Sequence, residues 1–241
     1  MVFGLPECDY LTSDMYSGYL TVTATKRLHY VFVTSQSDPQ NDPLILWFNG
    51  GPGCSSLIGL FQEHGPFIID DGEYHIKTNP HPWNERANVL YIESPAGVGY
   101  SIGELPNDRI HNDMSTSKDA FAALQDFYSG FPEWLNNDVY VTGESYAGIY
   151  APYLAWQIHQ HNKLVEVYKT TQKYNLKGFI VGNGATDWEV DVHPSFPEVA
   201  YNFNIIPPRL IKSYLSNNCT YYYHDVMPPK TNNTVCMELW E

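Results

Sequence analysis

The sequence of 241 residues has no long hydrophobic run and little positive charge. Its longest apolar stretch, residues 44–48, is far too short to span a bilayer. Only 13 lysines and arginines stand against 27 aspartates and glutamates, which gives a formal net charge of −14, and the cationic side chains form no cluster. Nucleic acids and anionic membranes both require basic patches, so we expect neither as a partner.

Cysteine is scarce as well, with four in the chain, and there is no Cys-x-x-Cys pair and no His-Glu-x-x-His pattern. These are common zinc-binding spacings, so we expect no metal site. Cys219 and Cys236 flank a polar stretch that also holds two glycosylation sequons, at Asn218 and Asn232. A short-loop disulfide beside two sequons indicates an oxidising compartment of the secretory route. Residues 1–6 lack the features of a signal peptide, so we expect that such a peptide has been removed or that the sequence is a fragment.

Hydrophobic residues make up 43% of the chain, which excludes intrinsic disorder and allows a large core. Continuous apolar runs, each followed by a glycine-containing loop, occupy 43–48, 88–93, 138–142 and 176–181. Runs of this kind are typical of strands covered on both faces of a sheet. Helical patterns lie between them, at 113–128, where Asp113 is placed to cap the helix, and after Ser145. The alternation predicts an α/β fold with a mostly parallel central sheet flanked by helices, preceded by an antiparallel hairpin at 18–23 and 28–34.

The pattern changes near residue 187. From there to residue 241 the strand–helix alternation stops, and Pro, Asn and Tyr become frequent, with one short helix expected at 209–215. We therefore predict that residues 1–186 form the N-terminal part of an α/β core. Residues 187–241 are predicted to begin a cap or insertion.

One candidate for chemistry is the segment Gly-Glu-Ser-Tyr-Ala-Gly at 143–148, which stands between an apolar strand and a helix. This context is typical of a nucleophile elbow, where a sharp turn presents a serine hydroxyl at the head of a helix. Ala147 takes the place of the second glycine of the usual pattern. The alternative is that Ser145 occupies a tight turn without any chemistry.

A second loop, Asn-Gly-Gly-Pro-Gly-Cys-Ser-Ser at 49–56, follows the first apolar run and precedes an expected helix at 57–64. Its glycines allow backbone N–H groups to face outward, as an oxyanion hole requires. A phosphate-binding loop is the alternative. It does not match, because no lysine follows and Pro52 removes one donor.

Three segments, in the family's order, resemble signatures of the serine carboxypeptidases, a family of α/β-hydrolases. They are Trp-Phe-Asn-Gly-Gly-Pro-Gly-Cys-Ser-Ser at 47–56, Glu-Ser-Pro-Ala-Gly-Val-Gly-Tyr-Ser at 93–101 and Gly-Glu-Ser-Tyr-Ala-Gly at 143–148. Within the family the greatest likeness is to the cathepsin A-like members, on residues 16–20 and 63–66. The resemblance covers about residues 16–190 and implies an α/β-hydrolase fold with the start of a helical cap insertion.

The resemblance also implies roles for single residues. Ser145 would be the nucleophile, and the backbone N–H groups of Gly51 and Tyr146 would form the oxyanion hole. The group implied to hold the free C-terminal carboxylate of a peptide consists of Trp47, Asn49, Gly50, Glu63 and Glu144. The two glutamates can bind an anion only while protonated, so we expect burial to raise their pKa values and peptide hydrolysis to be favoured at acidic pH.

The triad partners of the serine are missing. In this fold an Asp and then a His follow the nucleophile, but none of the nine histidines lies after an apolar strand beyond Ser145, and His193 and His224 are expected at the surface. The chain therefore resembles the nucleophile-bearing large chain of a processed member, with the C-terminal half of the hydrolase domain absent. The resemblance places the disulfide partner of Cys54 in that half, and Cys8 has no counterpart.

The resulting prediction is a serine-type carboxypeptidase that releases C-terminal residues through an acyl-enzyme, in the lysosome, the vacuole or outside the cell. Alone, the chain is expected to turn over little substrate. A small chain or C-terminal half would supply Asp and His, a homodimer is an expected assembly, and no metal or organic cofactor is implied. One alternative is an acyltransferase on the same scaffold. The other is a truncated, non-catalytic form that binds partner proteins.

Overall fold

A computed structural model describes residues 1–6, 11–69, 75–169, 172–192, 195–220 and 232–239. The chain forms two compact units, Met1–Gly184 and Ala185–Glu241. Cys8, His193 and His224 lie outside the described residues. Among the described helices, none combines the length and the apolar character that crossing a membrane requires.

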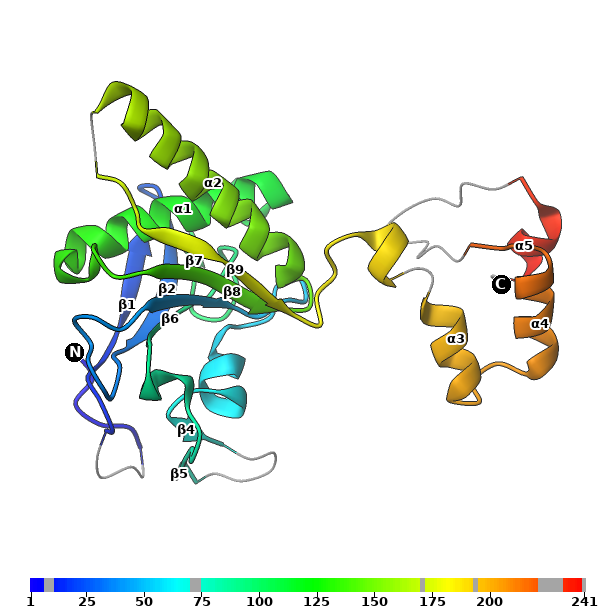
Figure 1. Cartoon of the computed structure of the whole chain (residues 1–241), viewed down its shortest axis with the longest axis horizontal. Helices are drawn as coiled ribbons and strands as arrows, with labels where there is room; N and C mark the ends of the chain where they lie inside the picture. Colours follow the sequence, from blue (N-terminus) through cyan, green and yellow to red (C-terminus); the bar gives the residue numbers. More distant parts are fainter. Residues whose placement is uncertain (7–10, 70–74, 170–171, 193–194, 221–231, 240–241) are drawn as a thin grey trace. The chain divides into compact units, whose positions relative to one another are not determined.

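The first unit is built on one mixed sheet (Figure 1). Its strands, in spatial order, are β1 (Met15–Thr21), β2 (Lys26–Val33), β6 (Asn88–Ile92), β3 (Leu44–Phe48), β8 (Val139–Glu144) and β9 (Leu176–Gly182). The pairs from β1 to β6 are antiparallel, and those from β6 to β9 are parallel. A short strand, β7 (Ile102–Gly103), pairs with β2. The predicted hairpin and apolar strands therefore all belong to this sheet.

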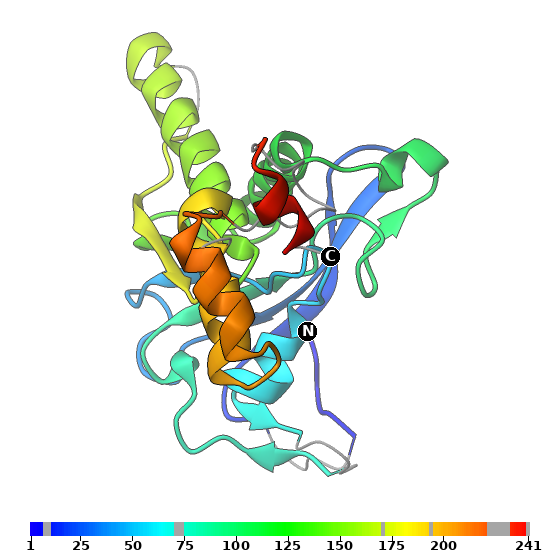
Figure 2. The ribbon, with the colours of Figure 1, turned by 90° about the vertical axis from the view of Figure 1, so that its right-hand side faces the viewer.

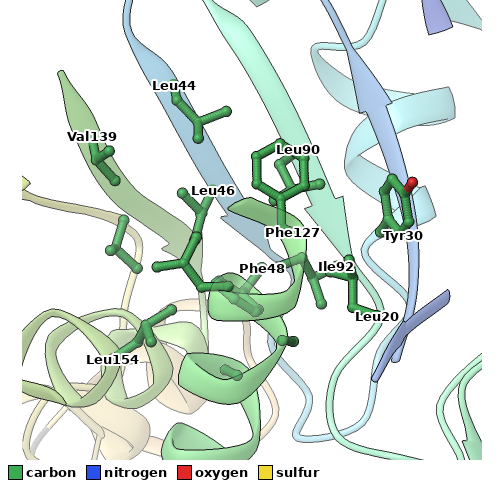
Figure 3. Packing of buried hydrophobic residues seen from close by; sticks show 14 of the residues in the cluster. Leu20, Tyr30, Leu44, Leu46, Phe48, Leu90, Ile92, Phe127, Val139 and Leu154 are labelled. Atoms are coloured by element: carbon green, nitrogen blue, oxygen red, sulfur yellow. The ribbon is translucent and has the colours of Figure 1, made fainter. Parts of the chain in front are cut away.

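Two helices, α1 (Asp113–Gly130) and α2 (Ala147–Tyr168), cover one face of the sheet, and the helical segment η1 (Gly59–Glu63) lies on the other face (Figures 1 and 2). Because successive side chains of a strand point to opposite faces, an apolar run supplies both cores. In β3, Leu46 belongs to the larger cluster with the two helices, whereas Trp47 belongs to the smaller cluster with Leu60 (Figure 3).

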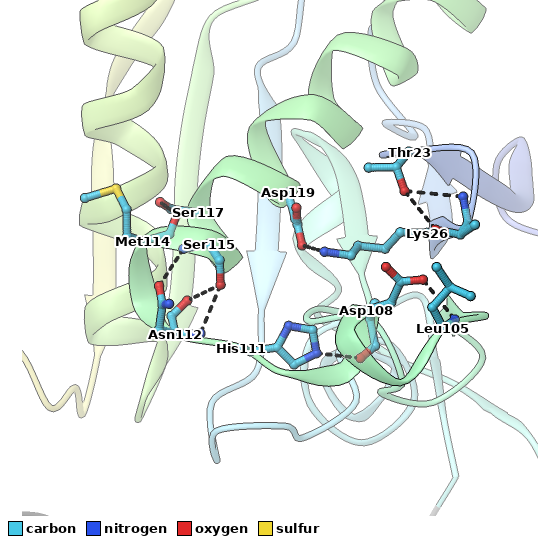
Figure 4. Close-up of polar contacts among 12 residues, drawn as sticks. Thr23, Lys26, Leu105, Asp108, His111, Asn112, Met114, Ser115, Ser117 and Asp119 are labelled. Carbon is cyan, nitrogen blue, oxygen red and sulfur yellow. Dashed lines mark hydrogen bonds and ion pairs between the residues drawn. The ribbon is translucent and has the colours of Figure 1, made fainter.

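Short elements complete the first unit. They are the hairpin of β4 (Phe67–Ile68) and β5 (Lys77–Thr78) and the turns η2 (Trp83–Glu85), η3 (Pro106–Arg109) and η4 (Pro132–Trp134). Helix α1 begins at the expected residue, but its cap is Asn112 and not Asp113: the Asn112 side chain accepts a hydrogen bond from the Ser115 N–H (Figure 4). Asp113 instead accepts a hydrogen bond from the Tyr146 hydroxyl, at 2.9 Å.

Strand β9 departs from the expectation that every apolar strand is covered on both faces. It is the last strand of the sheet, and Phe179 and Ile180 are 52% and 55% exposed. As the last strand of the sheet it has a neighbouring strand on one side only, so these two side chains lack the cover that a further strand would bring.

The second unit contains η5 (Trp188–Val192), α3 (Ser195–Asn202), α4 (Pro208–Ser216) and α5 (Thr234–Glu238). The sequence predicted α4 alone. Helix α5 is too short to display a clear helical repeat, and α3 lies in the stretch whose proline content pointed to irregular structure. A disulfide joins Cys219 to Cys236, and the sequon residues Asn218 and Asn232 are both exposed. The disulfide therefore connects the segment that follows α4 to helix α5.

Replacing both Cys219 and Cys236 by serine is expected to destabilise the second unit by about 3 kcal/mol, because a crosslink of this loop length limits the unfolded chain to that extent. Hydrogen exchange of the α4 amides should accelerate while exchange in the first unit stays unchanged. Cys54→Ser is the matched control, since Cys54 is exposed and unbonded. Equal exchange of α4 in the two variants would contradict the expectation.

Candidate active site

The turn between β8 and α2 presents Ser145. Its φ of +56° lies in the left-handed region, which non-glycine residues adopt rarely and which is typical of a nucleophile elbow. The Ser145 N–H donates to the Gly182 carbonyl at 3.1 Å, which ties the elbow to the end of β9. A Cβ atom at Gly143 would lie 2.5 Å from the Phe48 carbonyl oxygen, so this position needs glycine. The result is an exposed Ser145 at the head of a helix.

The glycine-rich loop lies directly against this elbow. A Cβ atom built on Gly50 would be 2.4 Å from the Tyr146 nitrogen and 2.8 Å from the Ser145 Cβ atom. Gly51 has a φ of +106°, and in the described part of the chain its N–H donates no protein hydrogen bond. The Gly50 backbone thus lies against Ser145 and the Tyr146 nitrogen, and Gly51 follows it directly, which is the arrangement of loop and elbow that an oxyanion hole requires.

Asn49, at the end of β3, is the centre of a buried hydrogen-bond group. Its Nδ2 donates to Glu63 Oε1 at 2.8 Å and to Glu144 Oε1 at 2.9 Å. Its Oδ1 accepts from Trp47 Nε1 at 2.8 Å and from the Gly59 N–H at 3.0 Å. An indole N–H can only donate, so the amide cannot be turned over, and its two N–H groups must face the two glutamates.

The two glutamates reach Asn49 from different elements, since Glu63 ends η1 and Glu144 ends β8. Burial raises the pKa of Glu63; the Asn49 hydrogen bond opposes this rise, and the negative charge of Glu144 adds to it. A carboxyl group with a raised pKa stays protonated, and can donate a hydrogen bond, at a pH where an ordinary glutamate is ionised. The five residues implied as the carboxylate-binding group, Trp47, Asn49, Gly50, Glu63 and Glu144, are all brought together beside Ser145.

His64 is buried beside the Glu63 carboxyl group, a contact that the sequence analysis did not predict. Its ring stacks on Trp83 with centroids 4.0 Å apart, and its Nδ1 is 3.1 Å from the Tyr91 hydroxyl. Burial lowers the pKa of His64 to about 4, so the ring is neutral above that pH, with its Nε2 4.0 Å from Glu63 Oε2. The chain position of His64 before Ser145 excluded it as triad base, but gave no sign of this contact.

No histidine of the described residues hydrogen-bonds the Ser145 hydroxyl. His29 is bonded to Glu93 and Ser17, and His111 and His161 reach backbone carbonyl oxygens. In the same part of the chain, no three His, Cys, Asp or Glu side chains gather as a metal ion would need. The arrangement can therefore present a nucleophile, an oxyanion hole and an anion-binding group, but it needs a base from elsewhere.

Comparison with known proteins gives consistent matches. The family model described as serine carboxypeptidase matches residues 6–239. The chain is 43% identical to the lysosomal protective protein of Mus musculus over 224 residues, which is 90% of the chain and 44% of that protein. It is 41% identical to carboxypeptidase Y of Schizosaccharomyces pombe over 182 residues, which is 73% of the chain and 18% of that protein. The chain thus spans less than half the length of these relatives.

The fold has a matching solved structure. A prohormone-processing carboxypeptidase from Saccharomyces cerevisiae, Kex1(delta)p, superimposes with a TM-score of 0.75 and 25% sequence identity, over 98% of this chain and 54% of that one. The match confirms the predicted α/β-hydrolase fold with its mostly parallel central sheet.

Proposed function

The chain belongs to the serine carboxypeptidase family, and we propose that it carries the nucleophile and the carboxylate-binding site of an enzyme that releases C-terminal residues from peptides. The observation that carries this proposal is the pair of glutamates held by the buried Asn49 amide, one of which directly precedes the exposed Ser145. A protonated acid can donate to a carboxylate where no lysine or arginine is present. Every peptide carries such a carboxylate on its last residue, next to the last peptide bond.

The proposed reaction is acyl transfer to water in two steps. Ser145 Oγ attacks the carbonyl carbon of the last peptide bond, its proton passes through a base to the leaving amine, and the C-terminal amino acid departs. The Gly51 and Tyr146 N–H groups stabilise the oxyanion that forms in this step. Water then attacks the ester, which frees the shortened peptide with a new carboxylate and returns a proton to the Ser145 oxygen.

A further segment, either a C-terminal half or a small second chain, is proposed to supply the Asp and the His. Support comes from the edge strand β9, where the exposed Phe179 and Ile180 offer an apolar surface for more strands. The second unit is proposed to begin a cap. A homodimer is the proposed assembly of the complete enzyme.

The proposed location is the lysosome, the vacuole or the outside of the cell. Two features support it: the Cys219–Cys236 disulfide, which needs an oxidising compartment, and the exposed sequon residues Asn218 and Asn232, which are accessible to glycosylation. The relatives' names agree, since one of them is called a lysosomal protein.

The proposal is tested on the complete protein with two N-blocked dipeptides, one ending in a free carboxylate and the other in an amide. Mass spectrometry should detect release of the last residue from the free acid, and release from the amide at least about tenfold more slowly, because the amide cannot accept the protons of two acids as a carboxylate does. Equal rates would contradict the role of the glutamates. Transfer to an added alcohol in preference to water would indicate an acyltransferase, and no release at all would indicate a non-catalytic, partner-binding form.

Glu63→Gln is expected to weaken the pH dependence of KM. In the wild-type enzyme KM should stay low while Glu63 is protonated and rise by up to about tenfold per pH unit above its raised pKa, since the ionised acid repels the substrate carboxylate. The amide of E63Q cannot ionise, so its KM should rise less steeply between about pH 4 and 8. Glu133→Gln, at an exposed position, is the control. Superimposable KM profiles of E63Q and the wild type would contradict the role of Glu63, and a flat wild-type profile would contradict the two-acid mechanism.

A further inference from the structure

A second buried carboxylate lies on the other side of the glycine-rich loop. Glu93 follows β6 directly and is fully buried. Its Oε1 accepts a hydrogen bond from the Ser55 hydroxyl, and its Oε2 accepts from His29 Nδ1 at 3.0 Å and from the Tyr100 N–H at 2.8 Å. No lysine or arginine contacts it within the described residues, so these three donors hold the carboxylate.

Glu93 is an anion in this setting. Burial opposes ionisation, but the hydrogen bonds from His29, Ser55 and Tyr100 together lower the pKa of Glu93 below its ordinary value. An ionised carboxylate only accepts hydrogen bonds, so Ser55 and His29 Nδ1 must be the donors. The backbone packs closely around the carboxylate, because a Cβ atom at Gly99 would lie 1.8 Å from Glu93 Oε1 and only glycine fits at that position.

The Ser55 hydroxyl connects this anion to the oxyanion loop. While it donates to Glu93, it also accepts from the Leu57 N–H at 3.2 Å, at the start of the helical turn that leads to η1. Ser55 therefore fixes the C-terminal end of the loop that contains Gly51. On the proximal side, Cys54 N–H donates to the Gly50 carbonyl at 3.0 Å and closes the turn.

Asn49, the centre of the carboxylate-binding group, is held by hydrogen bonds that do not involve Ser55 or Glu93. The Ser56 hydroxyl donates to the Ile92 carbonyl at 2.6 Å and accepts from the Asn49 N–H at 3.3 Å. The Asn49 side chain is held by its four hydrogen bonds to Trp47, Gly59 and the two glutamates. Loss of the Ser55–Glu93 contact should therefore leave Asn49 in place.

We propose that Glu93 is a positioning residue, which acts through Ser55 to hold the Gly51 N–H in the oxyanion hole. This inference rests on the proposed carboxypeptidase function. His29 orients the carboxylate from the other side, where its Nε2 is 3.0 Å from the Ser17 hydroxyl. In Glu93→Gln the charge is lost and one oxygen becomes an NH2 group. His29 Nδ1 and the Tyr100 N–H both reach the Oε2 position, so the remaining oxygen is favoured there and the NH2 group faces Ser55, whose hydroxyl then loses its acceptor.

The expected consequence is a change in kcat with little change in KM. Displacing one oxyanion donor slows acyl transfer, whereas the substrate carboxylate still meets Asn49, Glu63 and Glu144. Measured on the complete enzyme with an N-blocked dipeptide, Glu93→Gln and Ser55→Ala should each lower kcat by about 10- to 100-fold. Their KM values should stay within about twofold of the wild type.

A double-mutant cycle separates this role from general stabilisation. If Glu93 acts through Ser55, the variant with both substitutions should lose no more kcat than the more damaged single variant. Glu104→Gln removes a carboxylate from an exposed ion pair with Arg27 and serves as the control, with unchanged kcat. Multiplying effects in the double variant would overturn the proposal, and so would a rise in KM at constant kcat.

Ser55→Ala keeps the proposal testable if Glu93→Gln does not fold, because it removes only a hydroxyl group at the loop. An unchanged kcat in S55A would overturn the proposal. The wild-type enzyme is assayed first, and absence of peptide hydrolysis there would count against the proposed function instead.

Discussion

Ser145→Ala is expected to lower peptide hydrolysis by the complete enzyme by about a thousandfold or more. The reason is that the acyl-enzyme needs this oxygen, and removal of a serine nucleophile eliminates nearly all covalent catalysis. The same substitution should abolish labelling by a fluorophosphonate, which reacts with activated serines. The measurement is kcat/KM on a dipeptide, together with peptide mapping of the label.

The control for this prediction is Ser129→Ala, which alters an exposed serine of α1 whose hydroxyl donates only to the Gln125 carbonyl. Activity and labelling of S129A should match those of the wild type. Hydrolysis that survives in S145A, or a label on another serine, would contradict the assignment of the nucleophile. Equal melting temperatures of the two variants would show that the loss in S145A is chemical.

Gly50→Ala is expected to lower kcat/KM by about a hundredfold or more. The added methyl group would lie 2.4 Å from the Tyr146 nitrogen and 2.8 Å from the Glu144 carbonyl oxygen, so the loop and the elbow must move apart. This separation displaces the two backbone N–H groups from the oxyanion, and loss of one such donor alone typically costs about 10²–10³ in kcat. Overpacking should also reduce the free energy of unfolding by about 1–3 kcal/mol.

Gly130→Ala is the matched control, because a Cβ atom at Gly130 meets no atom within 4 Å. It should leave both kcat/KM and the unfolding free energy close to the wild-type values. If G50A retained full activity, the close approach of the glycine-rich loop to the elbow could not be what builds the site. Measurement of kcat/KM and of denaturant unfolding in both variants decides the question.

Strain and close packing coincide at this corner of the sheet. Ser145 adopts a left-handed conformation, and both Gly50 and Gly143 lie where no Cβ atom fits. Such geometry persists only when the surrounding structure holds it, which here means the β3 and β8 strand ends and the head of α2. Activity is therefore expected to be sensitive to substitutions that change backbone spacing without touching a reactive group.

Much of the fold could be predicted from local patterns. The continuous apolar runs correctly indicated β3, β6, β8 and β9. For β3, β6 and β8 the reason is that a strand buried on both faces must be apolar at successive positions. The helix caps were less predictable, since Asn112 and Asp113 are both good capping residues. The choice between them depends on Tyr146, which comes close only in the folded chain and takes Asp113 as its partner.

The exposure of Phe179 and Ile180 in β9 could not be predicted for a related reason. Residues 176–181 have the apolar composition of a covered strand. This composition shows that the strand can pack against other apolar side chains, but not whether such side chains are present. How far Phe179 and Ile180 are covered depends on the rest of the fold, and among the described residues they stay 52% and 55% exposed.

The sequence by itself determined the family, the glycine-rich loop and the candidate nucleophile Ser145, because these are encoded in short contiguous motifs whose geometry is local. Only the tertiary structure decided how the Asn49 amide faces Glu63 and Glu144, that His64 stands behind Glu63, and that Glu93 holds the oxyanion loop from behind. The contacts of Asn49 with Glu144 and of Ser55 with Glu93 join segments that are far apart in the chain, and His64 is held beside Glu63 by Trp83 and Tyr91 from a later segment. Their hydrogen bonds and their burial come from packing across the sheet, which no local pattern of residues records.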